Sequence, residues 1–313
     1  MDLIADVGAT NSRCALLDDQ GQVAKSESFE NADFTGLPGL LRIFLEHRRA
    51  SDQPKRAAIA VAAPVTGDQV VMTNIAWQFS QAELRQELGL SRLMIVNDFA
   101  AQAWALPTLG PGDCHQVGSG TGLTRTTLAV IGPGSGLGVA TLTPSGDGWT
   151  ALSGEGGHVT LPAETDREAA LIEMMREEHG HCSAERLLSG PGLVRIYMGL
   201  ARLAGRESAQ LQPADVTALA DQGEPLAKHA FDCFFDMLGT IAGNLALTVG
   251  AKGGVYIAGG IVPRMLNRFE ASGFRERFEA KGRYRGYLSA IPTYVVTDPV
   301  PAFRGLRSLL GYR

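Results

Sequence analysis

The sequence has few cysteines and no arrangement of them typical of a metal site. Cys14, Cys114, Cys182 and Cys233 are scattered over 313 residues, without a CxxC pair or a Cys/His cluster. This spacing argues against zinc, and isolated cysteines are typical of a reducing compartment. The first six residues carry neither a basic region nor a long apolar stretch, so we expect no signal peptide and a cytoplasmic protein.

The sequence also lacks a basic excess and an uninterrupted apolar run. The 28 Lys and Arg residues against 33 Asp and Glu give a net charge of −5, which argues against a nucleic-acid or membrane partner. The most apolar stretch, residues 231–250, is interrupted by Asp232, Asp236 and Asn244. It predicts a buried core helix rather than a membrane span.

Three common motifs of nucleotide-binding proteins and hydrolases are missing. The sequence has no G-x-x-x-x-G-K-[ST] phosphate loop and no G-x-S-x-G elbow. The stretch "GPGSGLGVA" (132–140) does not satisfy G-x-G-x-x-G, and it leads into a strand-like run instead of a helix. A dinucleotide site of the common type is therefore not expected.

The hydrophobic pattern alternates strand-like and helix-like segments, which is typical of an α/β protein with a largely parallel sheet. The length favours two domains, and the Gly- and Pro-rich stretch 106–122 is the best candidate for a hinge. We expect strands over residues 3–5, 14–17, 57–62, 93–96, 128–131, 139–142, 255–258 and 294–296. We expect helices over residues 37–48, 81–88, 99–106, 167–178, 184–188, 193–203 and 265–270.

Two segments roughly 125 residues apart share one layout, at a longer period than solenoid repeats show. "IADVGATNSRCALLDD" and "AVIGPGSGLGVATLTP" each consist of an apolar strand, a turn of small residues and a second apolar strand. They predict two similar domains, each opening with a tight hairpin. Two such turns could bind a polyphosphate from opposite sides.

Both turns contain residues suited to binding an anion through the backbone. Small residues let several N–H groups point at one phosphate, and the candidates are Gly8, Ala9, Thr10 and Asn11 in the first turn and Gly134, Ser135 and Gly136 in the second. The alternative is that these are ordinary hairpin turns. Asp6, at the end of the first strand, could hold Mg²⁺ directly or through water, or could merely cap the turn.

A third glycine site follows a buried strand. Gly259 and Gly260 could let an adenine lie against the backbone, or they could serve close packing of the strand against a helix.

Polar residues that could bind a hydroxyl-rich acceptor lie in three other segments. Asn97 and Asp98 follow a buried strand, where open α/β sheets bind ligands, and Asp98 could take a proton from an attacking hydroxyl. Both residue types also favour a helix N-cap.

Glu155 and His158, on a glycine-rich loop, could bind neighbouring hydroxyls, or could be a solvated acid and a structural histidine. Glu185 could contact the same ligand or could interact with a helix dipole.

The motifs together resemble those of bacterial glucokinases of the proteobacterial type. "DVGATNSR", "APVTGD", "MTN", "VNDF", "GPGSGLGVA", "SGEGGHV", "SAERLLSGPGL" and "IAGGIVPR" occur in order along nearly the whole chain. The resemblance implies a two-lobed actin-like ATPase (ribonuclease H-like) fold with a cleft between lobes. It implies a small α/β domain of residues 1–108, onto which a C-terminal helix (298–313) packs back, and a larger α+β domain of residues 109–297.

The resemblance also implies transfer of a phosphoryl group from Mg-ATP to the 6-hydroxyl of D-glucose. Asp98 would be the base, while Asn97, Glu155, His158 and Glu185 would hold other hydroxyls. The turns at 8–11 and 134–136 would contact phosphates, and Gly259 and Gly260 would lie near adenosine. The family is usually dimeric and cytosolic, so we expect a homodimer.

One residue departs from the family pattern, and its effect has two interpretations. Two other functions are also alternatives. Ala9 stands where the family typically has glycine, so it is either strained, if the position needs a positive φ, or only crowds the phosphate. Another hexose, such as mannose, glucosamine or fructose, could be the substrate. An actin-like ATPase that phosphorylates no sugar is a further alternative.

Overall fold

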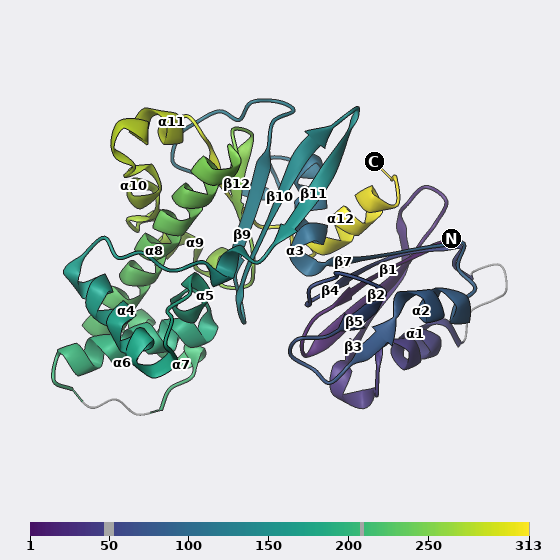
Figure 1. Ribbon diagram of the computed structural model, residues 1–313, viewed down its shortest axis with the longest axis horizontal. Coiled ribbons are helices and arrows are strands. Elements are labelled where there is room, and N and C mark those ends of the chain that lie inside the picture. The colour runs from purple at the N-terminus through teal and green to yellow at the C-terminus, as the bar shows by residue number, and fades with distance from the viewer. Residues whose placement is uncertain (47–52, 207–209, 313) are drawn as a thin grey trace. The chain divides into compact units, whose positions relative to one another are not determined.

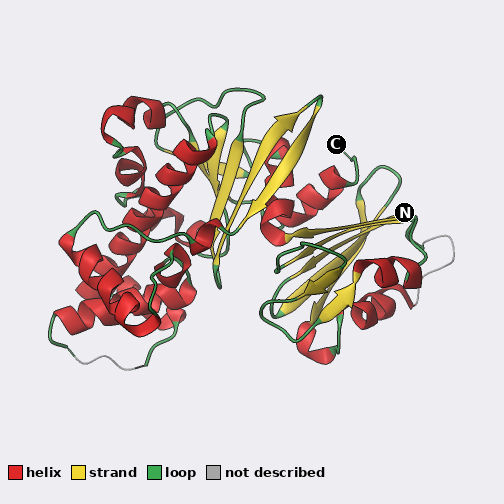
Figure 2. Ribbon diagram, viewed as in Figure 1, coloured by secondary structure: helices red, strands yellow, loops and turns green. Residues whose placement is uncertain are grey.

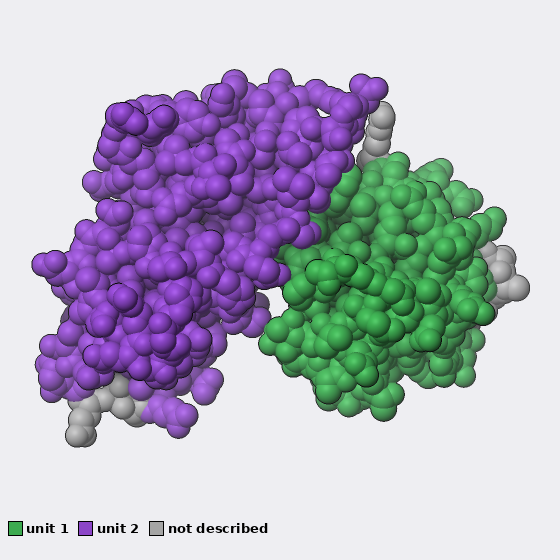
Figure 3. Space-filling model, in the orientation of Figure 1, with its two compact units in different colours: residues 1–110, 298–313 green, residues 111–297 purple. Residues whose placement is uncertain are grey.

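The computed structural model describes residues 1–46, 53–206 and 210–312. They form two compact units, distinguished by colour in Figure 3. Unit 1 comprises Met1–Gly110 and Asp298–Arg313, and unit 2 comprises Pro111–Thr297. The last two residues of the helix expected over 37–48 lie outside the described residues.

Unit 1 contains a five-stranded sheet in the order β3-β2-β1-β4-β7. The strands β1, β2 and β3 are successive antiparallel neighbours, whereas β4 and β7 run parallel to β1. Their bounds are β1 Asp2–Val7, β2 Asn11–Leu17, β3 Val23–Glu30, β4 Arg56–Val61 and β7 Arg92–Asn97. A separate hairpin pairs β5 (Gln69–Val71) with β6 (Gln78–Ser80).

Alternate residues of β1 face opposite helical layers, as the two-residue period of a strand dictates. Leu3, Ala5 and Val7 belong to a buried cluster with α1 (Leu37–Glu46) and α2 (Gln81–Glu87). Ile4 belongs to the cluster on the other face, with α3 (Asp98–Ala105) and α12 (Pro301–Leu309). Figure 1 shows these helix pairs on the two sides of the sheet.

The C-terminal helix is held against α3 by close backbone contact. Gly305 lies so near the carbonyl of Ala101 that a Cβ at this position would collide with it. The described residues of unit 1 also form the 3₁₀ turns η1 (Asn31–Asp33) and η3 (Leu106–Thr108). Residues 298–313 therefore belong to the same unit as the N-terminal sheet.

Unit 2 repeats the strand pattern of unit 1 in a six-stranded sheet, ordered β11-β10-β9-β12-β13-β8. Again three successive strands are antiparallel neighbours, and the next strand, β12, runs parallel to the first. The predicted pair of hairpins is thus confirmed (Figure 2). The bounds are β8 Cys114–Val117, β9 Leu128–Pro133, β10 Leu137–Ser145, β11 Gly148–Gly154, β12 Gly254–Ile257 and β13 Thr293–Val296.

Helices cover one face of this sheet, with α8 (Pro225–Val249) at the centre. Its Phe231, Phe234 and Phe235 side chains are fully buried. Its length and composition would allow it to cross a membrane, but 72% of its most apolar window is buried, as expected for a core helix. The other helical elements of unit 2 are η4 Gly156–His158, α4 Asp166–His179, α5 Ala184–Leu187, α6 Gly190–Leu203, α7 Pro213–Asp221, η5 Val262–Met265, α9 Leu266–Glu270, α10 Phe274–Glu279, η6 Gly282–Tyr284 and α11 Arg285–Ser289.

Candidate functional site

The first glycine turn joins β1 to β2 at the end of the central strand of unit 1. Val7 pairs with Ser12, and the Gly8 N–H donates a hydrogen bond to the Asn11 carbonyl at 3.0 Å. Gly8 and Ala9 are half-buried, whereas Thr10 and Asn11 are exposed. The turn therefore leaves its outer backbone surface open to a ligand.

Ala9 adopts the turn without a left-handed backbone. Within the described residues, the one non-glycine residue with a positive φ is Arg125, at 51°. The strain that a positive φ would impose on alanine is therefore absent at position 9. Relative to glycine, Ala9 adds a single methyl group to the turn.

Asn31 holds the first turn through hydrogen bonds to its backbone, and nothing in the sequence pattern indicated this role. Its side-chain amide donates to the Gly8 carbonyl at 2.9 Å, and its backbone N–H donates to the Thr10 carbonyl at 2.8 Å. Its amide oxygen accepts from the Ser12 hydroxyl at 2.7 Å. Asn31 and Ser12 are 4% and 1% exposed, so these bonds are shielded from water.

Asp6, near the end of β1, has the character of a carboxylate that a cation would stabilise. Burial raises the pKa of Asp6, and the positive charge of Arg13 opposes this shift. No group of three or more His, Cys, Asp or Glu side chains could hold a metal within the part of the chain that the structure describes. Mg²⁺ often uses one or two carboxylates together with phosphate oxygens and water, so a single carboxylate before a turn that is expected to bind phosphate fits that ion.

The second glycine turn joins β9 to β10 and is built similarly. The Gly134 N–H donates to the Gly136 carbonyl at 2.8 Å, and the Gly190 N–H at the start of α6 donates to the Gly134 carbonyl at 2.8 Å. The carboxylate of Glu185 accepts from the Leu137 N–H at 2.8 Å. Both ends of the turn are thus tied to the α5–α6 segment.

Gly259 packs behind the second turn. Its φ is +80°, and a Cβ there would collide with the Pro133 carbonyl, so both the backbone conformation and the space require glycine. Gly260 has open space beside it. The packing alternative is therefore supported for Gly259, whereas Gly260 leaves room for a ligand.

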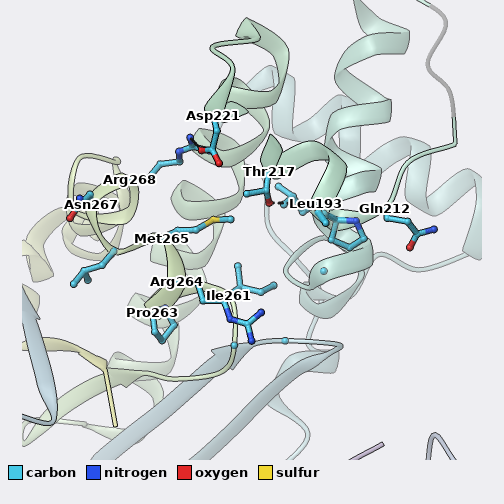
Figure 4. Close-up of a pocket in the computed structure, with 16 residues that line it drawn as sticks. Leu193, Gln212, Thr217, Asp221, Ile261, Pro263, Arg264, Met265, Asn267 and Arg268 are labelled. Atoms are coloured by element: carbon cyan, nitrogen blue, oxygen red, sulfur yellow. Dashed lines mark hydrogen bonds and ion pairs between the residues drawn. The ribbon is translucent and has the colours of Figure 1, made fainter. Parts of the chain in front are cut away.

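A large cavity of about 1170 Å³ lies beside Gly134 and Gly260 (Figure 4). Its walls come from the start of α6, from α7 and from residues 261–268. Leu193, Ile261 and Met265 supply apolar surface, and Gln212 and Thr217 supply polar groups. This mixture suits a nucleoside, and the sequence indicated none of it except the glycines.

A smaller cavity of about 210 Å³ brings together three predicted site residues of unit 2: Ser135, His158 and Glu185. The imidazole Nε2 of His158 lies 3.9 Å from Oε1 of Glu185. Glu155 does not line this cavity, but its carbonyl accepts from the His158 N–H at 2.9 Å. Arg186, Ser189 and Arg195 also line it, and the sequence had not indicated them.

Asn97 and Asp98 lie in unit 1, at the junction of β7 and α3. The Asn97 side-chain oxygen accepts from Phe99 N–H at 2.9 Å and from Ala100 N–H at 3.4 Å, so the helix-capping alternative is confirmed for this atom. Its Nδ2 donates to the Ala63 carbonyl at 3.3 Å. Asp98 is the first residue of the helix, half-buried, and accepts from Phe99 N–H at 2.9 Å.

Comparison with known proteins identifies the family. The sequence profile described as Glucokinase matches residues 3–311. The chain belongs to the glucokinase family. It is 47% identical over 318 residues to the glucokinase of Tolumonas auensis, covering 99% of this chain and 98% of that protein. It is 46% identical over 312 residues to the glucokinase of Paramagnetospirillum magneticum, covering 99% and 97%.

A solved structure supports the same conclusion for the fold. The crystal structure of glucokinase from an Antarctic psychrotroph superimposes with a TM-score of 0.89 at 37% identity, covering 99% of this chain and 98% of that one. The predicted actin-like ATPase fold is confirmed, and family membership makes ATP the expected phosphoryl donor.

Replacing Asn31 with alanine should weaken nucleotide binding about tenfold. The change leaves the Gly8 carbonyl and the Ser12 hydroxyl unpaired in a buried place, at a cost of about 1–3 kcal/mol per group. Calorimetric titration with Mg²⁺ and a non-hydrolysable ATP analogue measures the effect. Leu84→Ala, a core truncation elsewhere in unit 1, is the control: it should lower the unfolding temperature but leave this affinity unchanged. Wild-type affinity in a folded Asn31→Ala variant would contradict the role given to Asn31.

Proposed function

We propose that this chain transfers the γ-phosphoryl group of ATP to the 6-hydroxyl of D-glucose. The observation that carries this is the place of the second turn: Gly134 lines the large cavity, and its neighbour Ser135 lines the small one. A phosphate on this turn would join a nucleoside in the first cavity to a hydroxyl-rich ligand in the second. Phosphoryl transfer needs that juxtaposition.

We assign the roles in the reaction to the residues that the family resemblance indicates. Asp98 accepts the proton of the 6-hydroxyl, and Asn97, Glu155, His158 and Glu185 bind the other hydroxyls. The turns at residues 8–11 and 134–136 bind phosphates through backbone N–H groups, and Gly259 and Gly260 lie near adenosine. Asp6 would hold Mg²⁺, directly or through water, and the bound ion would offset phosphate charge.

The reaction is a single displacement at phosphorus. The sugar O6 bonds to the γ-phosphorus while the bond to the β,γ-bridging oxygen breaks, releasing ADP, and the O6 proton passes to the Asp98 carboxylate. The protein contributes mainly positioning and preorganised donors. Groups that pair with the sugar hydroxyls favour the sugar over water as acceptor, because they hold O6 in line with the γ-phosphorus, whereas a water molecule bound there is not positioned in this way.

The small cavity distinguishes this function from that of an actin-like ATPase without a sugar substrate. It places a carboxylate and an imidazole within 3.9 Å of each other beside the phosphate turn. A protein that only hydrolyses ATP has no need of such a hydroxyl-binding pair. We further propose that this protein is a cytosolic homodimer, because members of the family usually are.

Initial rates of ADP release across a panel of hexoses test the proposed function. We expect the highest kcat/KM for glucose, by about tenfold or more over mannose, glucosamine and fructose, because each hydroxyl that loses its hydrogen-bond partner costs binding. Sugar-independent ADP release would favour the ATPase alternative. A higher kcat/KM for another hexose would reassign the substrate.

Changing Asp98 to asparagine should lower kcat roughly 10²-fold or more and leave glucose affinity nearly unchanged, because the amide cannot accept the proton. Steady-state kinetics and glucose titration measure the two quantities. Asp19→Asn is the matched control, since it makes the same chemical change on a fully exposed side chain of unit 1. Near-normal turnover of Asp98→Asn would remove this residue from the role of base.

A further inference from the structure

The Glu185 carboxylate contacts the second glycine turn with one oxygen and faces the small cavity with the other. Oε2 accepts the Leu137 N–H at 2.8 Å, at the end of the phosphate turn. Oε1 faces His158 at 3.9 Å, in the small cavity. One side chain therefore contacts the backbone of the turn and is also open to a ligand in the cavity.

Close packing around Leu137 leaves this carboxylate little freedom. A Cβ at Gly136 would collide with the Glu185 carboxylate, and a Cβ at Gly157 would collide with the Leu137 carbonyl. The sugar-side loop at 155–158 thus packs directly on the residue that ends the phosphate turn. Movement of the carboxylate would displace the backbone of the turn, because the atoms between them are in van der Waals contact.

The helix that carries Glu185 is itself fixed. The Ala184 N–H donates to the Val159 carbonyl at 2.8 Å, and Ser183 forms an isolated β-bridge with Thr160. Ala184 and Leu187 on either side of Glu185 are buried. The backbone of residue 185 is therefore anchored, and the carboxylate can support the turn.

We propose that Glu185 is a positioning residue for the phosphate turn, and that it thereby couples sugar binding to nucleotide binding. This proposal rests on the proposed function. The bond from Leu137 N–H orients the turn before any ligand arrives. A sugar hydroxyl on Oε1 restricts the carboxylate further and so lowers the ordering cost of nucleotide binding. By linkage, bound nucleotide strengthens sugar binding by the same factor.

A Glu185 that contacts only the sugar predicts a different result. In that case, its removal weakens glucose binding but does not alter nucleotide binding in the absence of sugar. In our proposal, nucleotide affinity falls even without sugar, because the turn has lost its support. Nucleotide binding to the sugar-free enzyme therefore separates the two roles.

The test is calorimetric titration of the sugar-free enzyme with Mg²⁺ and a non-hydrolysable ATP analogue. Glu185→Ala should bind the nucleotide about 5- to 20-fold more weakly, whereas Glu185→Gln should remain within about twofold of wild type, because its amide oxygen still accepts from Leu137. Glu173→Ala is the matched control: it makes the same chemical change on an exposed side chain of α4 in unit 2, which pairs with Arg176, so this affinity should not change. Unaltered affinity in Glu185→Ala, or an equal loss in Glu185→Gln, would overturn the proposal.

Amide hydrogen exchange of the ligand-free protein keeps this test independent of the proposed function. Exchange at Leu137 should be faster in Glu185→Ala than in wild type, and similar to wild type in Glu185→Gln. If the wild type fails to phosphorylate glucose but shows this pattern, the proposed function fails and the positioning role stands. If exchange at Leu137 is equal in all three proteins, the positioning role fails even in an active glucose kinase.

Discussion

A turn that binds an anion through its N–H groups does so best when its carbonyl oxygens are bonded elsewhere, and donors bond several carbonyls of both glycine turns. In unit 1, Asn31 bonds the carbonyls of Gly8 and Thr10. In unit 2, the Gly190 N–H bonds the carbonyl of Gly134. Because carbonyl oxygens would repel phosphate, these donors behind the turns are what make a site without a lysine chemically reasonable.

Much of the fold could be predicted from the sequence because its buried strands are apolar and its turns carry glycine. The strands that went unpredicted, such as β3 and β11, are largely exposed and polar, so they lack the apolar signal. Helices α7, α10 and α11 were also missed; α10 and α11 are only 6 and 5 residues long. Periodicity is weak over so few residues.

The candidate site was predictable where residue type and local spacing carry the chemistry. The turns at 8–11 and 134–136 belong to this class. The i, i+3 spacing linked His158 with Glu155, whereas in the structure the His158 side chain lies close to Glu185, from another segment. Asn31 could not be found, because its role depends on bonds to a turn about 20 residues away in sequence, which only the folded sheet creates. The large cavity was missed for the same reason, since its walls come from helices distant in sequence.

Amide resonances of the two turns, followed by NMR during titration with Mg-ADP and separately with adenosine, test the central claim most directly. If backbone N–H groups bind the phosphates, Mg-ADP should shift the resonances of both residues 8–11 and residues 134–137. Adenosine alone should shift mainly residues around the large cavity. Phosphate-dependent shifts that leave either turn unchanged would contradict the account.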